Sequence, residues 1–256
     1  MVGFSGIGTP SFAQLEELPT FRWEQHLQVP PISSSILGKQ VLHFKTVDKP
    51  YTRDANAVKL VEEELQGAKE LDSDAGVLRF GSDAVTLDGA YIELGVCTGK
   101  TINFIAALNP NKIIYGFDSF EGLPEDWVRQ DKVIKKGTFG FKEDNFTPPA
   151  LANVKFYKGW FKDSLPEYVI NKLKETPIAF LHVDSDIYSS SREALEIFQN
   201  NIVPGTVIVF DEYFNYPGFE NHEYKAFMEF LSLRKLRAEY LAYNKNHEQV
   251  AIRIVE

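Results

Sequence analysis

Carboxylate side chains stand at the ends of four short apolar runs of the chain. They are Glu93, Asp118, Asp184 and Asp211. If these runs are parallel β-strands, the acids share the carboxyl edge of one sheet, where ligands bind near the point at which the strand order reverses. A single acid at a strand end is commonly the N-cap of the next helix. Four at one edge instead indicate a site for cations, hydroxyl groups or both.

Two of these acids have further acids beside them. Asp184 is followed by Ser185 and Asp186, and Asp211 is followed by Glu212. Clustered carboxylates cannot all remain ionised unless a cation compensates their charge or a proton is shared. A cluster with only oxygen donors favours a hard dication such as Mg²⁺, Mn²⁺ or Ca²⁺ over zinc. The alternative is that these acids cap the following helices without a metal ion.

A glycine turn lies between Glu93 and Thr101, after the first run. Its glycines, Gly95 and Gly99, let the backbone approach a ligand closely, and the next helix N-terminus offers N–H groups to an anion. A phosphate-binding P-loop needs four residues between its first glycine and its Gly-Lys-Thr sequence, and only three are present here. A dinucleotide-binding turn needs a second glycine where Cys97 stands. Both patterns fail.

The remaining pattern, acid-x-Gly-x-x-x-Gly, suits S-adenosylmethionine. The methionine carboxylate of this cofactor can accept bonds from the helix N–H groups, while its ammonium prefers the carboxylate of Glu93. Asp118, at the end of the second run, is placed to accept hydrogen bonds from both ribose hydroxyls. From these two segments the predicted cofactor site takes Glu93, Gly95, Val96, Thr98, Gly99, Thr101, Asp118, Ser119 and Phe120.

Apolar runs and helical patterns alternate after Gly89, and these elements must position the acids. The runs cover 90–94, 113–117, 154–157, 178–183 and 207–210, and helical patterns lie at 101–108, 165–174 and 189–200. The segment 164–167 gives the middle helix a capping-box pattern. Near-continuous apolar strands separated by helices are typical of a parallel sheet covered on both faces. We therefore predict a doubly wound, mostly parallel, Rossmann-like α/β sheet. A helix at 222–234 and runs at 238–243 and 249–255 add an antiparallel C-terminal edge hairpin.

The first 80 residues differ from the rest of the chain. Residues 1–50 are rich in Pro, Ser and Gly with scattered aromatics, which predicts an irregular arm that packs on its own domain or on a neighbouring subunit. Apolar residues then recur at helical spacing to about Leu71, with Asp54 as the N-cap. We divide the chain into an N-terminal arm and helix, residues 1–80, and a cofactor-binding domain, residues 81–256, whose longest loop is 125–149.

Composition excludes several classes of protein. The 256 residues are 44% apolar and 25% charged, which is ordinary for a soluble globular protein. A net charge of −9 argues against nucleic-acid binding, which needs a basic face; we interpret the lysines at 132, 135 and 136 as a solvated loop. The single cysteine, Cys97, excludes an intramolecular disulfide and a cysteine-based zinc site. With no signal sequence and no apolar run of about 20 residues, we expect a cytoplasmic protein that contacts no membrane.

Between Tyr91 and Phe230 the chain resembles the macrocin O-methyltransferase family, metal-dependent sugar O-methyltransferases of antibiotic pathways. The resemblance rests on the strings at 93–96, 117–124, 158–161, 182–188 and 211–213. The Asp-Ser-Phe-Glu-Gly-Leu-Pro string that begins at Asp118 and the Asp-x-Asp-x-Tyr string that begins at Asp184 are specific, whereas the glycine turn is shared by all class I methyltransferases.

The resemblance implies roles for particular residues. Asp184, Asp211 and Glu212 match the metal ligands, although the family often has Asp at the position of Glu212. Asp186 matches the catalytic base. The cofactor site gains Trp160 and Phe161, which fall where the adenine ring is usually enclosed, and Asp184. Residues 1–80 match poorly, and in the family this region helps to form the acceptor pocket. The resemblance and the aromatic arm together favour a homo-oligomer.

A mechanism follows from these assignments. The metal ion, expected to be Mg²⁺, would chelate two neighbouring hydroxyls of the acceptor and lower the pKa of the one to be methylated. Asp186 would remove its proton, and the oxygen would attack the sulfonium methyl in line. We expect the acceptor to be a small molecule, a sugar moiety of a glycosylated natural product.

Two other functions stay open. Catechol-type methylation of an aromatic diol needs a similar metal site, but that class usually has Asp-Asn where Asp211 and Glu212 stand. A non-catalytic nucleotide- or metal-binding module would not need Asp186. Further residues have less specific sequence signals. His182 is an alternative base or a core histidine, and His222 is a candidate contact for the acceptor. Tyr213, Phe214, Tyr216 and Phe219 form an aromatic wall or pack in the core, Lys100 is interpreted as a surface residue, and Tyr51 and Arg53 as a lid over the cofactor.

Overall fold

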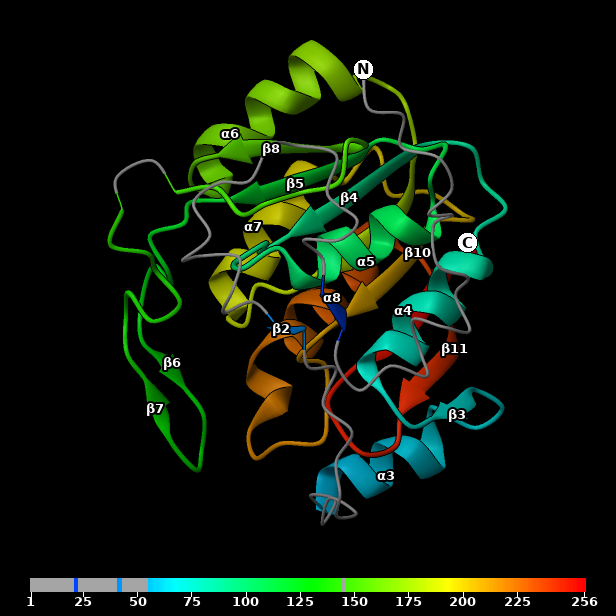
Figure 1. Cartoon of the computed structure of the whole chain (residues 1–256). Helices are drawn as coiled ribbons and strands as arrows, with labels where there is room; N and C mark the ends of the chain where they lie inside the picture. The colour runs from blue at the N-terminus through cyan, green and yellow to red at the C-terminus, as the bar shows by residue number, and fades with distance from the viewer. Residues whose placement is uncertain (1–20, 23–40, 43–54, 144–145) are drawn as a thin grey trace, which may run out of the picture.

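An eight-stranded sheet forms the centre of the protein (Figure 1). The computed structural model describes residues 21–22, 41–42, 55–143 and 146–256. The strand order is β3-β11-β12-β10-β9-β4-β5-β8. The strands are β3 (Lys69–Leu71), β4 (Ala90–Leu94), β5 (Ile114–Asp118), β8 (Val154–Lys158), β9 (Ile178–Val183), β10 (Val207–Phe210), β11 (Ala238–Asn244) and β12 (Val250–Ile254).

Strand order reverses between β4 and β9. From β4 the chain proceeds outward through β5 to β8, and it then returns to place β9 and β10 on the other side of β4; all these neighbours are parallel. β12 is antiparallel to both β10 and β11. The predicted doubly wound, mostly parallel sheet is confirmed, and its reversal point is the place where ligands bind in such sheets.

Helices cover both faces of the sheet. On one face, α4 (Asp74–Asp83) and α5 (Lys100–Leu108) share a buried cluster with Phe180 of β9. On the other, α3 (Ala55–Glu63), α6 (Phe161–Tyr168), α7 (Tyr188–Ile197) and α8 (Glu223–Arg234) share a second cluster with Leu181 and Ile208. All six residues of β9 are buried, because helices cover both faces of the sheet here; five of them are apolar and the sixth is His182.

Two local predictions at the N-terminal side of the sheet are wrong. The helix predicted from Asp54 to about Leu71 ends at Glu63, and Gly67, with φ of +91°, helps the chain to turn before β3. β3 then pairs in parallel with β11, so the C-terminal hairpin is covered by a further strand and is not the sheet edge. Asp54 itself lies outside the described residues.

The predicted capping box is also wrong. α6 begins at Phe161 with Trp160 as its N-cap, and the Ser164 hydroxyl, inside the helix, donates a hydrogen bond to the carbonyl of Trp160. The helix continues into a π-helical turn, η2 (Val169–Leu173). Pro166 is the sixth residue of the helix and has no backbone N–H, so it cannot donate to the carbonyl four residues earlier, that of Lys162.

Short elements complete the structure. The predicted loop 125–149 contains a hairpin of β6 (Trp127–Val128) and β7 (Val133–Ile134), and a 3₁₀ turn, η3 (Phe219–Asn221), precedes α8. β1 (Phe21–Arg22) pairs with β2 (Val41–Leu42). The proposed division after residue 80 falls inside α4 and stays a prediction.

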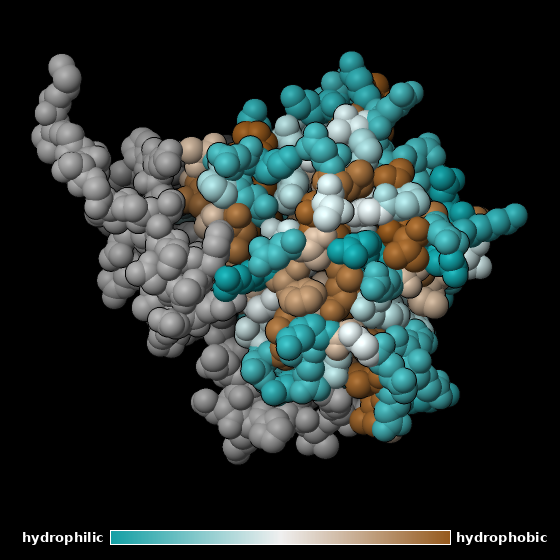
Figure 2. Space-filling model, turned by 90° about the vertical axis from the view of Figure 1, so that its right-hand side faces the viewer, coloured by the Kyte–Doolittle hydropathy of each residue, from teal (hydrophilic) through white to brown (hydrophobic). Residues whose placement is uncertain are grey.

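The surface mixes polar and apolar groups. On the face shown in Figure 2, hydrophilic residues surround hydrophobic ones that gather in patches between them. Among the described residues, no helix combines the length and the apolar character that crossing a membrane requires.

Candidate functional site

A cavity of about 790 Å³ opens at the carboxyl edge of the sheet, beside the reversal point. Loops after five parallel strands and the first turns of α7 form its wall. The lining residues are Gly95, Cys97, Asp118, Ser119, Glu121, Gly122, Leu123, Pro124, Lys136, Phe139, Gly159, Trp160, Phe161, Lys162, Asp184, Ser185, Asp186, Ser189, Ser190, Glu193 and Glu212. A cavity of this size can hold a ligand as large as a nucleoside-containing cofactor.

Most of the predicted site residues with charged or aromatic side chains reach this cavity. Of all the predicted site residues, the ones that line the cavity are Gly95, Asp118, Ser119, Trp160, Phe161, Asp184, Asp186 and Glu212. Val96, Gly99, Thr101 and Phe120 are buried behind the wall, Thr98 is exposed outside it, and Glu93 and Asp211 lie beneath it. Sequence reasoning missed Lys136, Phe139 and the α7 serines, because only the folded chain brings these segments to the cavity.

Gly95 marks the closest approach of two loops. It has φ of +85°, and a Cβ placed on it would lie 1.7 Å from the carbonyl oxygen of Asp184. The backbone N–H of Asp184 in turn donates to the carbonyl of Leu94 at 2.9 Å. Only glycine permits this contact, which joins the loop after β4 to the loop after β9.

Asp118 organises the glycine turn from the neighbouring strand. Its Oδ2 accepts the backbone N–H groups of Val96 and Cys97 at 2.8 and 2.7 Å, and its Oδ1 accepts that of Phe120 at 2.6 Å. A carboxylate has about four lone-pair sites, so roughly one remains for a ligand. The predicted contact with ribose hydroxyls stays a prediction, and this geometry adds a structural role to it.

Glu93 is buried more deeply than the sequence indicated. Its side chain is 0% exposed, accepts a hydrogen bond from the Thr101 hydroxyl at 3.0 Å, and lies 3.1 Å from Nδ1 of His182. In this structure both of its oxygens therefore contact other side chains. Its predicted contact with a cofactor ammonium stays a prediction. To make that contact, an oxygen of Glu93 would have to bind the ammonium in addition to its present partner.

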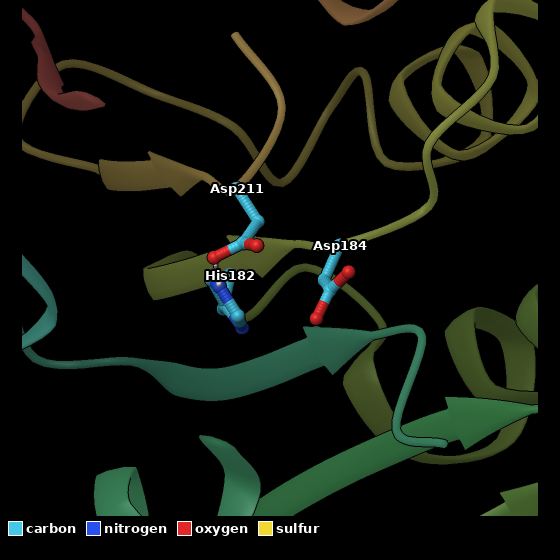
Figure 3. A group of neighbouring side chains, drawn as sticks. All are labelled: His182, Asp184 and Asp211. Carbon is cyan, nitrogen blue, oxygen red and sulfur yellow. Dashed lines mark ion pairs between the residues drawn. The ribbon is translucent and has the colours of Figure 1, made fainter. Parts of the chain in front are cut away.

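The acids after β9 and β10 come together, as we predicted from their positions at adjacent strand ends. The side chains form two groups, and within each group the atoms that could bind a metal ion lie within 4.8 Å of one another. One group is His182, Asp184 and Asp211, and the other is Asp184, Asp186 and Glu212. Asp184 belongs to both. Figure 3 shows the His182 ring beneath the Asp211 carboxylate, with Asp184 beside them. The three predicted metal ligands are thus distributed over two adjoining groups.

Crowding and burial disturb the protonation of these acids. Burial, together with the charge of Asp211, raises the pKa of both Asp184 and Glu212 well above the usual range. The same two causes raise the pKa of Asp186 to about 7. Asp211 is the exception: the charges of His182 and Lys100 outweigh its burial and lower its pKa to about 2. His182, flanked by carboxylates, has a pKa of about 10 despite its burial.

Glu223, on α8, joins the two acidic loops and was missed by the sequence analysis. It is 0% exposed; its Oε1 accepts the backbone N–H of Ser185 at 3.2 Å and its Oε2 accepts that of Glu212 at 3.1 Å. One carboxylate therefore fixes the loop after β9 relative to the loop after β10. No local sequence signal could reveal this, since the partners are 38 and 11 residues away.

Several of the weaker expectations are resolved by burial. The four aromatic residues proposed as a wall are at most 2% exposed and pack in the core: Tyr213, Phe214, Tyr216 and Phe219. His222 lies 3.1 Å from the Val128 carbonyl and is not on the cavity wall. His182 is a core histidine with a hydrogen-bond partner.

Two basic residues have structural contacts. Lys100 is partly exposed, and its ammonium lies 2.7 Å from the Asp74 carboxylate, a contact between α5 and α4 that the sequence analysis did not predict. Tyr51 and Arg53 lie outside the described residues.

Arg129, 7% exposed, lies 3.1 Å from the buried carboxylate of Glu248 and stacks 3.9 Å from the Tyr216 ring.

Cys97 faces the cavity as an uncharged thiol. Burial raises its pKa to about 12, and the negative charges of Asp184 and Asp118 add to the shift. Its backbone has φ of +47°, a conformation that the two N–H bonds to Asp118 help to hold.

Residues 81–241 match the sequence model of the macrocin O-methyltransferase family, TylF. Two relatives come from Streptomyces. The 8-demethyl-8-(2,3-dimethoxy-alpha-L-rhamnosyl)-tetracenomycin-C 4'-O-methyltransferase of Streptomyces olivaceus is 28% identical over 58% of this chain and 62% of its own length. The demethyldecarbamoylnovobiocin O-methyltransferase of Streptomyces niveus is 28% identical over 45% of this chain and 48% of its own length. The matched region spans less than two thirds of either relative.

Solved structures with the same fold include two of CalS11. The calicheamicin methyltransferase CalS11 superimposes with a TM-score of 0.56 and 20% identity, covering 91% of this chain and 90% of that one. An apo structure of CalS11, described as a TDP-rhamnose 3'-O-methyltransferase, gives a TM-score of 0.51 and 19% identity over 70% and 78% of the two chains. At these identities the likeness establishes the fold.

Substitution of Gly95 should destabilise the protein more than substitution of an unobstructed glycine. Gly95→Ala combines two costs, a positive φ and a clash with the Asp184 carbonyl. Gly67→Ala, at φ of +91° with no atom within 4 Å of the new Cβ, has only the cost of the positive φ, about 1–2 kcal/mol. Urea unfolding should show a clearly larger loss for Gly95→Ala. Equal losses would mean that the two loops can separate freely.

The buried Glu248 should make stability fall as pH rises. Burial raises its pKa to about 7, against the opposing charge of Arg129, so the folded protein retains a proton that the unfolded chain releases. This stabilisation is complete below the unfolded pKa near 4.5 and is lost as pH rises through about 7. The free energy of unfolding of the wild type, relative to Glu248→Gln, should decrease by on the order of 1–3 kcal/mol between pH 4.5 and 8. The exposed Glu167→Gln should show no such trend; a flat or rising difference for Glu248→Gln would contradict the assignment.

Proposed function

Because the chain belongs to the macrocin O-methyltransferase family, we propose that it transfers the methyl group of S-adenosylmethionine to a hydroxyl of a sugar on a small molecule. One observation carries the proposal: a single cavity is lined by the glycine turn, by Asp118, by the aromatic pair of Trp160 and Phe161, and by Asp186. These are a binding surface for a nucleoside-containing methyl donor and a base beside it.

The residues in and around the cavity suit S-adenosylmethionine. Gly95 and Cys97 bring the glycine turn to the cavity wall, and behind it Gly99 caps α5 without a side-chain hydrogen bond, so the first N–H groups of this helix would be left for an anionic group such as the methionine carboxylate. Asp118 and Ser119 lie at the end of β5, where the ribose is expected. Trp160 and Phe161 are half-buried on the wall and offer aromatic surface for the adenine ring. S-adenosylmethionine supplies a methyl group on a sulfonium, which makes that carbon electrophilic.

The acidic residues fit a hard dication. Oε2 of Glu212 is buried and has no hydrogen-bond partner among the described residues, and burial, together with the charge of Asp211, raises the pKa of both Asp184 and Glu212. A dication would relieve both conditions, so Asp184, Asp211 and Glu212 would hold it. When bound, such an ion lowers the pKa of a hydroxyl that it contacts.

Asp186 is suited to act as the base. It lines the cavity, and its pKa of about 7 lies near physiological pH, where a general base is most effective. Asp186 would take the proton of the acceptor hydroxyl as the oxygen forms its bond to the methyl carbon and the carbon–sulfur bond breaks. The products would be a methyl ether and S-adenosylhomocysteine, with the proton on Asp186.

A sugar acceptor is favoured over a catechol by the relatives. One is named for a rhamnosyl substrate, and CalS11 is described as acting on TDP-rhamnose. Catechol-type enzymes also usually have Asp-Asn where this chain has Asp211 and Glu212. A panel of glycosides and catechols, each incubated with labelled S-adenosylmethionine, separates the two acceptor classes. Turnover of catechols alone would overturn the sugar assignment.

Asp186→Asn should bind the donor normally but fail to turn over. Asparagine keeps the shape of the side chain and tolerates the φ of +63° found here, but it cannot accept the proton. We expect kcat to fall by about 10²–10⁴-fold, with the Kd for S-adenosylmethionine changed by less than about threefold in calorimetry. The exposed Asp83→Asn should behave as wild type. Full activity in Asp186→Asn would remove it as the base.

Chelation should abolish methyl transfer and leave donor binding intact. Treatment with EDTA followed by desalting removes a dication held by exchangeable carboxylates, and Mg²⁺ should restore the rate. Circular dichroism of the treated protein checks that the fold survives. Undiminished turnover by a preparation with far less than one metal ion per chain would sink the metal role but not the methyltransferase assignment.

A further inference from the structure

His182 presents a buried nitrogen to the acidic groups. Its ring is 0% exposed in the middle of the sheet, and Nε2 has no hydrogen-bond partner among the described residues. Oδ1 of Asp211 is 3.9 Å from Nε2, which is too far for a hydrogen bond. A buried polar atom without a hydrogen-bond partner is rare in folded proteins, and this one points toward Asp211 and Asp184 (Figure 3).

The other side of the ring is fixed by a carboxylate. Nδ1 lies 3.1 Å from Oε2 of Glu93, and the Thr101 hydroxyl holds the second oxygen of that carboxylate at 3.0 Å. Glu93 can accept the Nδ1–H; a dication that binds here would displace the proton that the flanking carboxylates hold on the other nitrogen of the metal-free ring, and the Nε2 lone pair would then face Asp211. Histidines that bind metal ions almost always donate their other N–H to such a partner, which orients the ring and strengthens the ligand.

The separation of the donors suits a shared ion. Nε2 of His182 and Oδ1 of Asp211 face each other at 3.9 Å without a hydrogen bond, and imidazole nitrogen and carboxylate oxygen are both ordinary ligands of a first-row dication. Asp184 completes the group, with all donor atoms within 4.8 Å. Asp184 also lines the cavity, so an ion can enter from that side.

We propose that Nε2 of His182 is itself a ligand of the dication, together with Asp184 and Asp211, and that Glu93 orients it from behind. This inference rests on the metal role in the proposed function. It adds one nitrogen donor to the carboxylate donors of the proposed function, Asp184, Asp211 and Glu212, and so makes an all-oxygen site a mixed nitrogen and oxygen site. Imidazole ligands favour transition-metal ions over Mg²⁺ and Ca²⁺, so the protein should prefer Mn²⁺ or Co²⁺. The alternative is a protonated His182 that pairs with Asp211 and leaves the ion to carboxylates alone.

Pulsed electron paramagnetic resonance of the Mn²⁺-loaded full chain tests the proposal directly. A directly bound imidazole gives a nitrogen coupling, and incorporation of [¹⁵N]histidine must change it. The chain has five histidines, so variants identify the source: His182→Gln should lose the coupling, and the matched His222→Gln should retain it. Because the labelled wild type already reports direct ligation, the experiment does not depend on His182→Gln folding well.

Metal affinity gives a second measurement. Calorimetry should show that the wild type binds Mn²⁺ more tightly than Mg²⁺, and that His182→Gln removes most of this preference. Glu93→Gln should retain the nitrogen coupling but weaken Mn²⁺ binding by about 10–100-fold, as loss of an orienting partner does.

Each failure has a distinct meaning. Mn²⁺ binding without a histidine coupling would overturn the inference and leave metal-dependent methylation standing. Absence of any Mn²⁺ binding, in a protein that still binds S-adenosylmethionine, would overturn both the inference and the metal role. Loss of S-adenosylmethionine binding as well would overturn the proposed function itself.

Discussion

Buried negative charge at the carboxyl edge is the constraint on which the rest of the site depends. Five acids, Glu93, Asp184, Asp186, Asp211 and Glu212, lie within a few residues of the ends of three adjacent strands, and burial acts to raise the pKa of each of them. Ionised carboxylates this close together repel one another, and a low-dielectric surrounding strengthens that repulsion. The fold must therefore supply compensating groups, whether protons, N–H donors, cationic side chains or a metal ion.

Backbone N–H groups compensate two further carboxylates at this edge of the sheet, Asp118 and Glu223. Asp118 accepts three backbone N–H groups, and Glu223 accepts two more. The contact between Gly95 and the Asp184 carbonyl fixes how closely the loops approach. These interactions leave the acids of the cavity wall with little freedom, so their positions are set before any ligand binds. Preorganisation of this kind is what electrostatic catalysis requires, since the groups need not reorganise during the reaction.

The sequence predicted the large features well because they depend on local pattern. The apolar run at 178–183 has the bounds of β9, and the acids that follow β9 and β10 meet because parallel neighbours bring their carboxyl ends to one edge. Predictions from the sequence were wrong where contacts between distant parts of the chain determine the local structure. β3 is a strand of three residues that exists through its pairing with β11. α6 begins at Phe161, before the pattern at 164–167 that predicted its start. Glu93, Glu223 and His182 acquire their roles from partners 11 to 89 residues away in the chain, which no spacing rule can identify.

The thiol on the cavity wall has a consequence for a protein that handles an alkylating donor. Thiolates are strong nucleophiles, whereas the protonated form is not. With a pKa of about 12, Cys97 is ionised in only about one molecule in 10⁵ at neutral pH. Burial, with the charges of Asp184 and Asp118 adding to it, thus keeps this sulfur in the form that competes least with a hydroxyl for a methyl group.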